Sequence, residues 1–589
     1  MNTSFESKRY DLVVVGGGIS GVCAAIAAAR HGANVALIQN RPVLGGNASS
    51  EVRMHICGAD YHASKKNARE TGIIEEILLD NRLANPQHSF SVLDTILWEK
   101  VTFQKGLDLY LNTHMTDVET QNNRIISIKA EQTSTERRFE FIAKNYVDTS
   151  GDAVLSLRAG ADIRTGRESR YEYDESLAPE SADNVMMGNT LMFESKDMGY
   201  PVPFKKPSWA NTYTEADLAD RSHKDITAGY WWIELGGTEL NTTRDGEVIR
   251  DELLKAVYGI WDHIKNGGEH GAENYALDWV GMLPGKRDSR RVLGDYVLNA
   301  NDLFGARVFE DTVAYGGWPM DMHVKDGLKS QESPTKWIET NDMYSIPYRC
   351  LYSRNVENLF VGGRNISASH MAFGSTRVMA TCGVIGQAIG TAAAMTIEKD
   401  TTPKGINSHI KELQHRLLKD DCYLFGIQDS DPKNFALKAR VTATSEQAGY
   451  EATKVINGFQ RNIGSEQNLW VSQPLSPQGE TLTLRFDQAI NVSETVINFD
   501  SNLSNEIMIT ISKPNKKAQR EGFPIEIVKD FTVTYKLNGQ TIHQHAVAEN
   551  HLRHNKITLD NSISCDEINI TVTATHGDPC ARIFEVKVF

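Results

Sequence analysis

The stretch YDLVVVGGGISGVCAAIAAARHGANVALIQN, residues 10–40, decides the fold class. Residues 10–15 are a short, β-branched apolar run that predicts a buried strand, and the alanine-rich residues 20–31 predict a helix. Residues 34–38 predict a second strand. This order is typical of a β-α-β unit in a parallel sheet, and it predicts an α/β, Rossmann-like domain at the start of the chain.

The turn between the first strand and the helix carries the pattern G-x-G-x-x-G. In dinucleotide-binding proteins the first glycine permits the tight turn, the second lets the backbone approach a pyrophosphate, and the third lets helix meet strand. The helix N-terminus then offers free N–H groups to the phosphates. The alternative is a glycine-rich turn without a ligand. The pattern predicts cofactor contacts from Gly16, Gly18, Ile19, Ser20 and Gly21.

The end of the second strand departs from the usual pattern. Dinucleotide sites place Asp or Glu there to bind ribose hydroxyls, whereas this chain has Gln39 and Asn40. Both amides can hydrogen-bond a ribose without repelling phosphate. We therefore expect a dinucleotide-binding site here, although its sequence motif lacks the usual acidic residue.

Three further elements favour FAD over NAD. The run RPVLGGNAS (41–49) resembles the loop that passes along the flavin in flavoproteins of the glutathione-reductase type. DTSGD (148–152) and NLFVGGR (358–364), the latter followed by GSTR (374–377), resemble two later flavin motifs of the same group. The resemblance implies cofactor contacts from Arg41, Gly45, Gly46, Asn47, Ser49, Gly151, Asp152, Gly363, Arg364, Ser375 and Thr376.

With these residues, the chain resembles the bacterial FAD-dependent oxidoreductase family, some of whose members carry the name xanthan lyase. The resemblance covers nearly all of residues 8–400, and its most specific stretch is NLFVGGRNISASHMAFGSTRVMATCGVIGQAIGTAA (358–393). The C-terminal part is similar to discoidin-like, galactose-binding β-sandwiches, through residues 439–459, 469–470, 482–487 and 581–589. Such modules either bind sugars or serve as rigid spacers, and the sequence leaves both open.

The domain prediction follows from these shifts along the chain. An aromatic-rich α+β insertion, with tryptophans that are mostly core, is typical of a substrate domain between two cofactor-binding segments. Residues 378–397 predict a buried core helix rather than a membrane span. After residue 435, strands are expected at 482–486, 494–500, 506–512, 529–536, 556–559, 567–574 and 582–589. The predicted parts are an FAD-binding domain (1–161 and 347–400), an inserted substrate domain (162–346), a helical linker (401–434) and a β-sandwich (435–589).

Flavin-dependent oxidation of a C–H bond needs a base for the departing proton, and histidine is suited to that role. His370 is the first candidate, because its position before Arg377 resembles the H-x-x-x-R neighbourhood of fumarate-reductase-like flavoproteins; the alternative is a packing or capping histidine. His55 and Arg53 share one face if their segment is extended. His323 is expected to reach the same cleft from the substrate domain.

Composition excludes several classes of function. The formal net charge is −14 and no basic block is present, which argues against a nucleic-acid partner. The 7 cysteines are scattered without C-x-x-C, so no metal site and no disulfide framework is expected. No secretory signal opens the chain, and we expect a cytoplasmic protein, or a periplasmic one where a signal peptide has been removed.

The sequence thus predicts an FAD-dependent oxidoreductase that transfers hydride between flavin and a polar small molecule, a carbohydrate or sugar-derived compound. Without a second G-x-G-x-x-G for NAD(P)H, its electrons are expected to pass to an external acceptor. Two alternatives stay open: a flavin monooxygenase-like enzyme, and a carbohydrate-binding protein with a structural flavin.

Overall fold

The computed structural model describes residues 4–268 and 270–589. The chain divides into two compact units, and each contains a segment from the other's part of the sequence. The first unit comprises the chain up to His62, His88–Ile410 and Met508–Ala518. The second comprises Ala63–Gln87, Lys411–Ile507 and Gln519–Phe589.

The predicted β-α-β unit is confirmed. Strand β1 (Glu6–Val15), helix α1 (Ile19–Arg30) and strand β2 (Val35–Ile38) follow in that order, and β1 pairs with β2 in parallel. All four residues of β2 and the last four of β1 are buried. A strand covered on both faces is typical of a parallel sheet with helices above and below.

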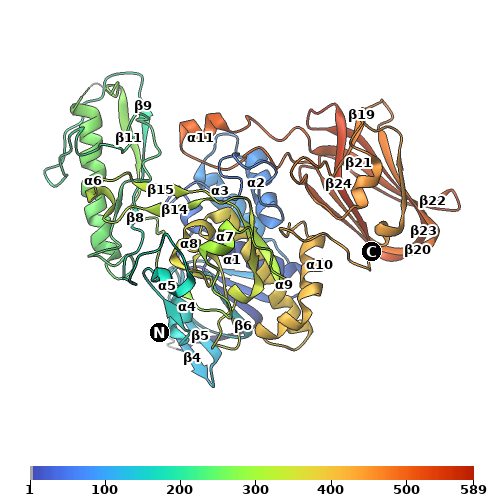
Figure 1. Ribbon diagram of the computed structural model, residues 1–589, viewed down its shortest axis with the longest axis horizontal. Coiled ribbons are helices and arrows are strands. Elements are labelled where there is room, and N and C mark those ends of the chain that lie inside the picture. Colours follow the sequence, from blue (N-terminus) through green and yellow to red (C-terminus); the bar gives the residue numbers. More distant parts are fainter. Residues whose placement is uncertain (1–3, 269) are drawn as a thin grey trace. The chain divides into compact units, whose positions relative to one another are not determined.

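The first unit is built on a seven-stranded sheet in the order β3-β2-β1-β6-β5-β4, with β17 paired to β6 (Figure 1). The strands β1, β2, β3, β6 and β17 run parallel, and β4 and β5 add an antiparallel edge. Residues from before and after the insertion therefore form one sheet. The bounds are β3 (Leu107–Tyr110), β4 (Thr113–Gln121), β5 (Arg124–Gln132), β6 (Arg137–Asp148), β17 (Leu359–Val361), α3 (Phe90–Thr102) and α4 (Val154–Arg158).

Helix α9 (Met379–Glu398) packs closely on α1. A Cβ added at Gly386 would lie 2.1 Å from the Ser20 carbonyl oxygen, and one added at Gly390 would lie 2.1 Å from that of Ala24. Among the described residues, α9 is the one helix long and apolar enough to cross a membrane, and 94% of its most apolar window is buried in the fold. The prediction of a core helix agrees with this burial.

The insertion forms short two-stranded sheets around helix α6 (Gly246–Asn266). Trp232 and Trp261 are buried in its apolar core, but Trp209 and Trp337 are exposed, so the prediction that most of the tryptophans are core holds only in part. Its elements, with α8 beyond them, are β7 (Ile163–Arg164), α5 (Arg170–Tyr173), β8 (Asn189–Thr190), β9 (Phe193–Asp197), β10 (Glu234–Leu235), β11 (Tyr275–Val280), β12 (Arg291–Val292), α7 (Ala300–Phe304), β13 (Thr312–Gly316), β14 (Met320–His323), β15 (Thr335–Ile338), β16 (Tyr344–Pro347) and α8 (His370–Thr376).

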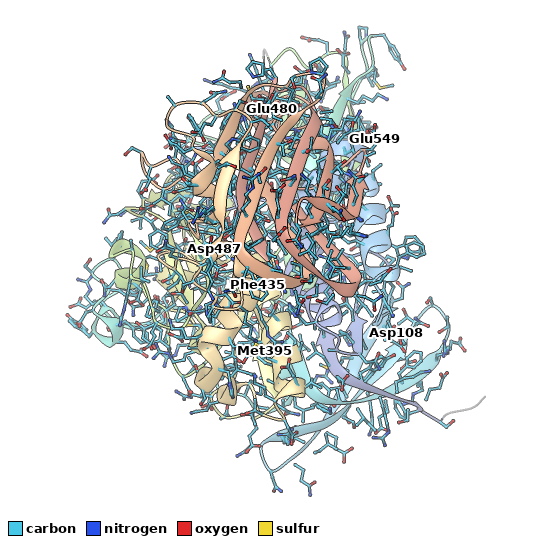
Figure 2. All side chains as sticks on the ribbon, turned by 90° about the vertical axis from the view of Figure 1, so that its right-hand side faces the viewer. Asp108, Met395, Phe435, Glu480, Asp487 and Glu549 are labelled. Carbon is cyan, nitrogen blue, oxygen red and sulfur yellow. The ribbon has the colours of Figure 1, made fainter. Side chains whose placement is uncertain are left out.

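The second unit holds the predicted β-sandwich. Its antiparallel strands lie in the order β19-β24-β20-β23-β21-β22, with β18 on β20, and the pairing of the long strands β20 and β23 shifts register. Figure 2 shows these strands facing the viewer, with Glu480 and Asp487 of the β20 strand labelled. The bounds are α2 (Ile73–Ala84), α10 (Ile410–Lys419), β18 (Arg440–Ala443), β19 (Trp470–Pro474), β20 (Glu480–Phe499), β21 (Val528–Leu537), β22 (Gln540–Val547), β23 (His554–Thr575) and β24 (Cys580–Val588).

The predicted strand at 506–512 is wrong. These residues lie outside the sheet and lead into α11 (Lys513–Ala518). Every residue from Glu506 to Ile511 is buried, and Met508 packs on Cys57 and Trp318 within the first unit. An apolar run bounded by polar residues therefore marked a buried segment here, but not a strand paired in a sheet.

The close packing of α1 and α9 gives a first prediction. Gly390→Ala should lower the free energy of unfolding by about 1–3 kcal/mol, because the added methyl group forces the two helices apart. Thermal and urea unfolding measure the effect. Gly246→Ala, at the first residue of α6 where an added Cβ meets nothing within 4 Å, is the matched control and should not destabilise. Equal melting temperatures for the two variants would contradict the packing argument.

Candidate functional site

The glycine turn after β1 lines a groove of about 230 Å³. Gly16 has φ +109°, and a Cβ there would lie 2.4 Å from the Thr149 carbonyl oxygen, so only glycine fits. A Cβ on Gly18 would meet nothing within 4 Å, because Gly18 faces the open groove. Most predicted cofactor residues line it: Gly16, Gly18, Ile19, Ser20, Gln39, Asn40, Arg41, Gly45, Gly46, Asn47, Gly151, Asp152, Gly363 and Arg364.

Four predicted cofactor residues do not line the groove. Gly21 lies at the packing contact between helix and strand, where a Cβ would come 1.9 Å from the Gly16 carbonyl oxygen. The Ser49 hydroxyl donates to the Gly46 carbonyl at 2.7 Å and fixes the loop. Ser375 donates to the Trp318 carbonyl, and it lies beside Thr376 in the buried helix α8. These four residues therefore pack within the fold and do not line the groove.

The end of the groove that follows β2, where a ribose was expected to bind, carries internal hydrogen bonds. Gln39 accepts from the Gly17 N–H at 2.9 Å and donates to the Val43 carbonyl at 3.0 Å. The Arg41 guanidinium lies 3.1 Å from Glu51. The amide of Gln39 thus orders the two loops that meet at the groove.

Asp152, which lines the groove, forms ion pairs with Lys286 and Arg364. Its carboxylate lies 2.5 Å from Lys286 Nζ and 3.5 Å from Arg364 Nη2. Burial alone raises the pKa of this carboxyl, but Arg364 and Lys286 outweigh it and lower the pKa below its usual value. Asp152 therefore stays charged and positions both cations.

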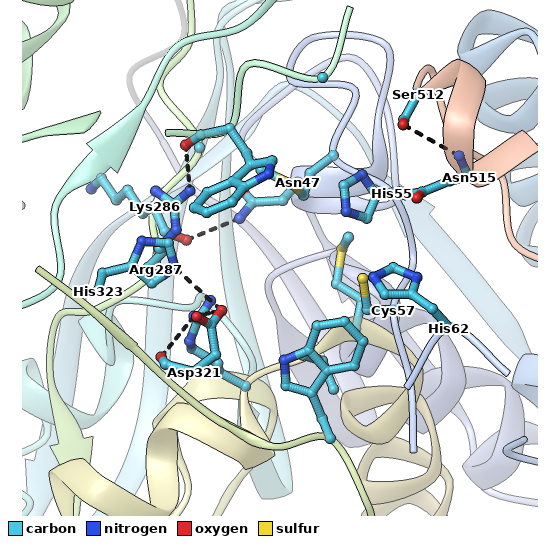
Figure 3. Close-up of a pocket in the computed structure, with 18 of the residues that line it drawn as sticks. Asn47, His55, Cys57, His62, Lys286, Arg287, Asp321, His323, Ser512 and Asn515 are labelled. Carbon is cyan, nitrogen blue, oxygen red and sulfur yellow. Dashed lines mark hydrogen bonds and ion pairs between the residues drawn. The ribbon is translucent and has the colours of Figure 1, made fainter. Parts of the chain in front are cut away.

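A second cavity of about 220 Å³ adjoins the groove (Figure 3). Asn47, Arg364, Arg377 and Met379 line both spaces, so the two share a wall. The rest of the lining comes from the segment after the flavin-like loop and from the insertion: Met54, His55, Cys57, His62, Trp231, Lys286, Arg287, Trp318, Asp321, His323 and Trp337, among others.

His323 is held between two carboxylates. Its Nδ1 lies 2.5 Å from Glu234 and its Nε2 lies 3.2 Å from Asp321. Burial alone raises the pKa of both carboxyls, but His323 outweighs it and lowers each pKa, helped by Arg287 at Glu234 and Arg377 at Asp321. With both ring nitrogens engaged, His323 has no free lone pair for a substrate proton.

His55 is in a different electrostatic state. It faces the same cavity and makes no hydrogen bond within the part of the chain that the structure describes (Figure 3). Burial, followed by the neighbouring His62 and Arg287, lowers its pKa to about 3. A neutral imidazole therefore faces the cavity at neutral pH.

The other two predicted catalytic residues lie elsewhere. His370 is buried at the start of α8, where its Nδ1 lies 3.2 Å from Asp288 and its backbone N–H donates to Glu168. Arg53 has φ +60°, which breaks the extended alternation expected for it and His55. Its guanidinium pairs with Glu194 and stacks 4.3 Å from the Trp279 ring. His55, His323 and Arg377 are thus brought together, whereas His370 and Arg53 are not.

Sequence reasoning missed much of the cavity. Lys286 and Arg287 lie in the stretch LPGKRDSRRVLGDYVL (283–298), whose resemblance to the family was the available signal. Glu234 and Asp321 had none, because they become partners of His323 only through the fold of the insertion. The segment Met508–Ala518 adds Ser512 and Asn515, which lie together at the edge of the cavity in Figure 3.

Comparison with known proteins identifies the core. Residues 11–417 match the sequence profile of a family described as FAD dependent oxidoreductase, and no curated protein matches. The chain is similar to the solved family 32 carbohydrate-binding module from C. perfringens NanJ in complex with galactose (20% identity, TM-score 0.20, 26% of this chain, 94% of that chain). It is also similar to the family 32 module from Streptococcus pneumoniae EndoD (21%, 0.21, 27% and 99%). The matched residues include the whole lining of the groove.

The state of His55 predicts a pH dependence of stability. Its pKa falls from 6.5 to about 3 on folding, so the unfolded chain binds the proton more tightly. The free energy of unfolding should therefore decrease as pH falls from about 6.5 toward 3, by up to ~1.4 kcal/mol per pH unit. His55→Gln should flatten this slope in urea unfolding measured across that range. The exposed His545→Gln is the control, and equal slopes for both variants would contradict the burial of a neutral His55.

Proposed function

The chain belongs to the FAD dependent oxidoreductase family, and on that premise we propose that it transfers hydride between FAD and a carbohydrate or sugar-derived compound. The observation that carries the proposal is the wall shared by the two cavities. A dinucleotide in the groove and a small polar molecule in the second cavity would meet at Asn47, Arg364 and Arg377.

The chemistry of the groove fits FAD. Gly18 leaves open space in front of the N-terminus of α1, where backbone N–H groups favour phosphate oxygens. Ser20 Oγ and Arg364 Nη1 are buried and have no hydrogen-bond partner among the described residues, as expected of groups that contact a ligand. Bound FAD supplies an isoalloxazine ring that accepts or returns a hydride.

The residues of the second cavity divide the remaining work. With FAD bound, His55 would take the hydroxyl proton of the substrate on an imidazole nitrogen while the hydride of the neighbouring C–H bond passed to the flavin, so that an alcohol became a carbonyl. Arg377 and Lys286, positioned by Asp321 and Asp152, favour negative charge on the reacting oxygen. His323 is a positioning residue, since it holds Asp321 against Arg377.

The substrate class follows from the lining. Trp231, Trp318 and Trp337 contribute aromatic surface, and sugar rings combine apolar C–H faces with hydroxyls. The indole N–H of Trp318 is buried without an acceptor in the described chain, and it is available to a substrate hydroxyl. Electrons leave through an external acceptor.

An anaerobic visible spectrum, titrated with neutral and acidic mono- and oligosaccharides, tests the function. Bleaching of a flavin spectrum by one sugar class supports the proposal and names the substrate. Fast reoxidation by air with substrate-stimulated turnover would favour the monooxygenase alternative instead. Tight sugar binding without bleaching would favour a carbohydrate-binding protein with a structural flavin, and a colourless protein that refuses added FAD would overturn the proposal.

Gly18→Val tests the groove. Its branched side chain would fill the space in front of the α1 N-terminus, so the purified variant should lose flavin absorbance and show an FAD affinity at least tenfold weaker by fluorescence titration. Gly246→Val, a like substitution at an open helix N-terminus, should retain flavin. Full flavin occupancy in Gly18→Val would place the pyrophosphate elsewhere.

His55→Asn tests the base. The variant should keep its flavin spectrum but lose about 10²–10⁴-fold in the rate of substrate-driven bleaching in anaerobic stopped-flow experiments. His545→Asn, which replaces an exposed histidine, is the control and should react at the wild-type rate. An unchanged rate in His55→Asn would assign proton removal to another group.

A further inference from the structure

A second group of histidines lies in the insertion, outside both cavities. Glu215, His223, His263 and His270 place one potential ligand atom each within 4.8 Å of one another. The Nε2 atoms of the histidines lie 3.3, 3.2 and 3.4 Å from the same oxygen, Oε1 of Glu215. The three rings also contact each other edge to face, with centroids 4.9–5.3 Å apart. Four side chains from distant parts of the sequence thus converge on one point.

The fold fixes the positions of the histidines. His263 lies in the last turn of α6 and is buried. A hydrogen bond of 2.9 Å between Nδ1 of His223 and the Arg221 carbonyl fixes the orientation of the His223 ring. Lys265 donates to the Ala272 carbonyl at 2.7 Å, which ties the loop after His270 to the end of α6. The imidazole side chains are 3–13% exposed, so the group is preformed rather than assembled from mobile surface residues.

Hydrogen bonds satisfy this group only in part: the Nε2 atoms of His223 and His263 lie within hydrogen-bond distance of Glu215, at 3.3 and 3.2 Å. A neutral His223 that donates its Nδ1–H to the Arg221 carbonyl presents a lone pair, not a proton, toward Glu215. The Nε2 of His270 is buried and has no hydrogen-bond partner among the residues that the structure describes. Lone pairs that face a carboxylate oxygen repel unless a cation lies between them.

We propose that Glu215, His223, His263 and His270 bind one zinc ion. Three imidazole nitrogens and one carboxylate oxygen are ligands that zinc accepts in tetrahedral sites. The Nδ1 hydrogen bond of His223 to a backbone carbonyl is the outer contact typical of a zinc-bound histidine. All four positions are filled by protein, and none of the four residues lines the groove or the second cavity, so the ion is structural.

The ion would join two segments of the insertion that carry little regular structure to the end of helix α6. Glu215 and His223 lie in the long connection between β9 and β10, and His270 lies between α6 and β11. Both segments would be bound to the end of α6. No metal was expected from the sequence because its cysteines form no C-x-x-C; these four residues follow no known spacing motif either, and only the fold brings them together.

Metal analysis of the full-length, tag-free protein tests the proposal independently of flavin or substrate. Inductively coupled plasma mass spectrometry should find about one zinc per chain, and a zinc chelator should lower the melting temperature until zinc is restored. His263→Ala should lose the zinc. Glu215→Gln, at a ligand whose side chain is 68% exposed and therefore unlikely to be needed for folding, should weaken zinc binding about 10- to 100-fold.

The control is His545→Ala, which removes an exposed histidine of the sandwich and should leave zinc content and melting temperature unchanged. Stoichiometric iron or another metal in place of zinc would overturn the assignment. So would a wild-type protein without metal that gains no thermal stability on adding zinc, or a Glu215→Gln variant with unchanged zinc affinity.

Discussion

The first unit depends on a backbone crossing that tolerates no side chain. The Thr149 hydroxyl donates to the Gly16 carbonyl at 2.8 Å, and Thr149 follows directly on the last residue of β6. Gly21 packs against the same carbonyl from α1. Because strand, turn and helix meet at this spacing, the N-terminus of α1 and the end of β6 open onto the same groove.

The segment that follows the insertion packs on the same strand and helix that meet at Gly16 and Thr149. Strand β17 adds to β6, and α9 then packs on α1 with glycines at the contact. Arg364 lies just after β17 and Arg377 just before α9, and both line the wall between the groove and the second cavity. The insertion also holds this wall in place, since Asp321 lies 2.7 Å from Arg377 and the Lys286 carbonyl accepts from Asn47.

The sequence predicted the features that depend on residues close together in the chain, and it missed those that depend on contacts between distant residues. The β-branched run of residues 10–15 and the glycines after it act within one β-α-β unit, so both the strand order and most of the groove lining were predictable. Residues 506–512 show the limit of the strand prediction, because residues 506–511 are all buried in the fold, with Met508 on Cys57 and Trp318, although the segment pairs with no sheet. The partners of His323 lie 89 and 2 positions away, and no spacing rule connects Glu234 to it.

The histidines show why residue type alone does not assign a role. The ring of His370 lies 3.2 Å from Asp288, while Glu168 accepts from its backbone N–H, and the ring of His323 lies between Glu234 and Asp321. His55 has no such partner, and its burial near Arg287 keeps it neutral. The sequence favoured His370 because it lies next to the flavin-like motif, whereas the fold turns its ring toward acids in the insertion. A base needs a free lone pair beside the reacting centre, and in the second cavity the electrostatic surroundings leave that lone pair on His55.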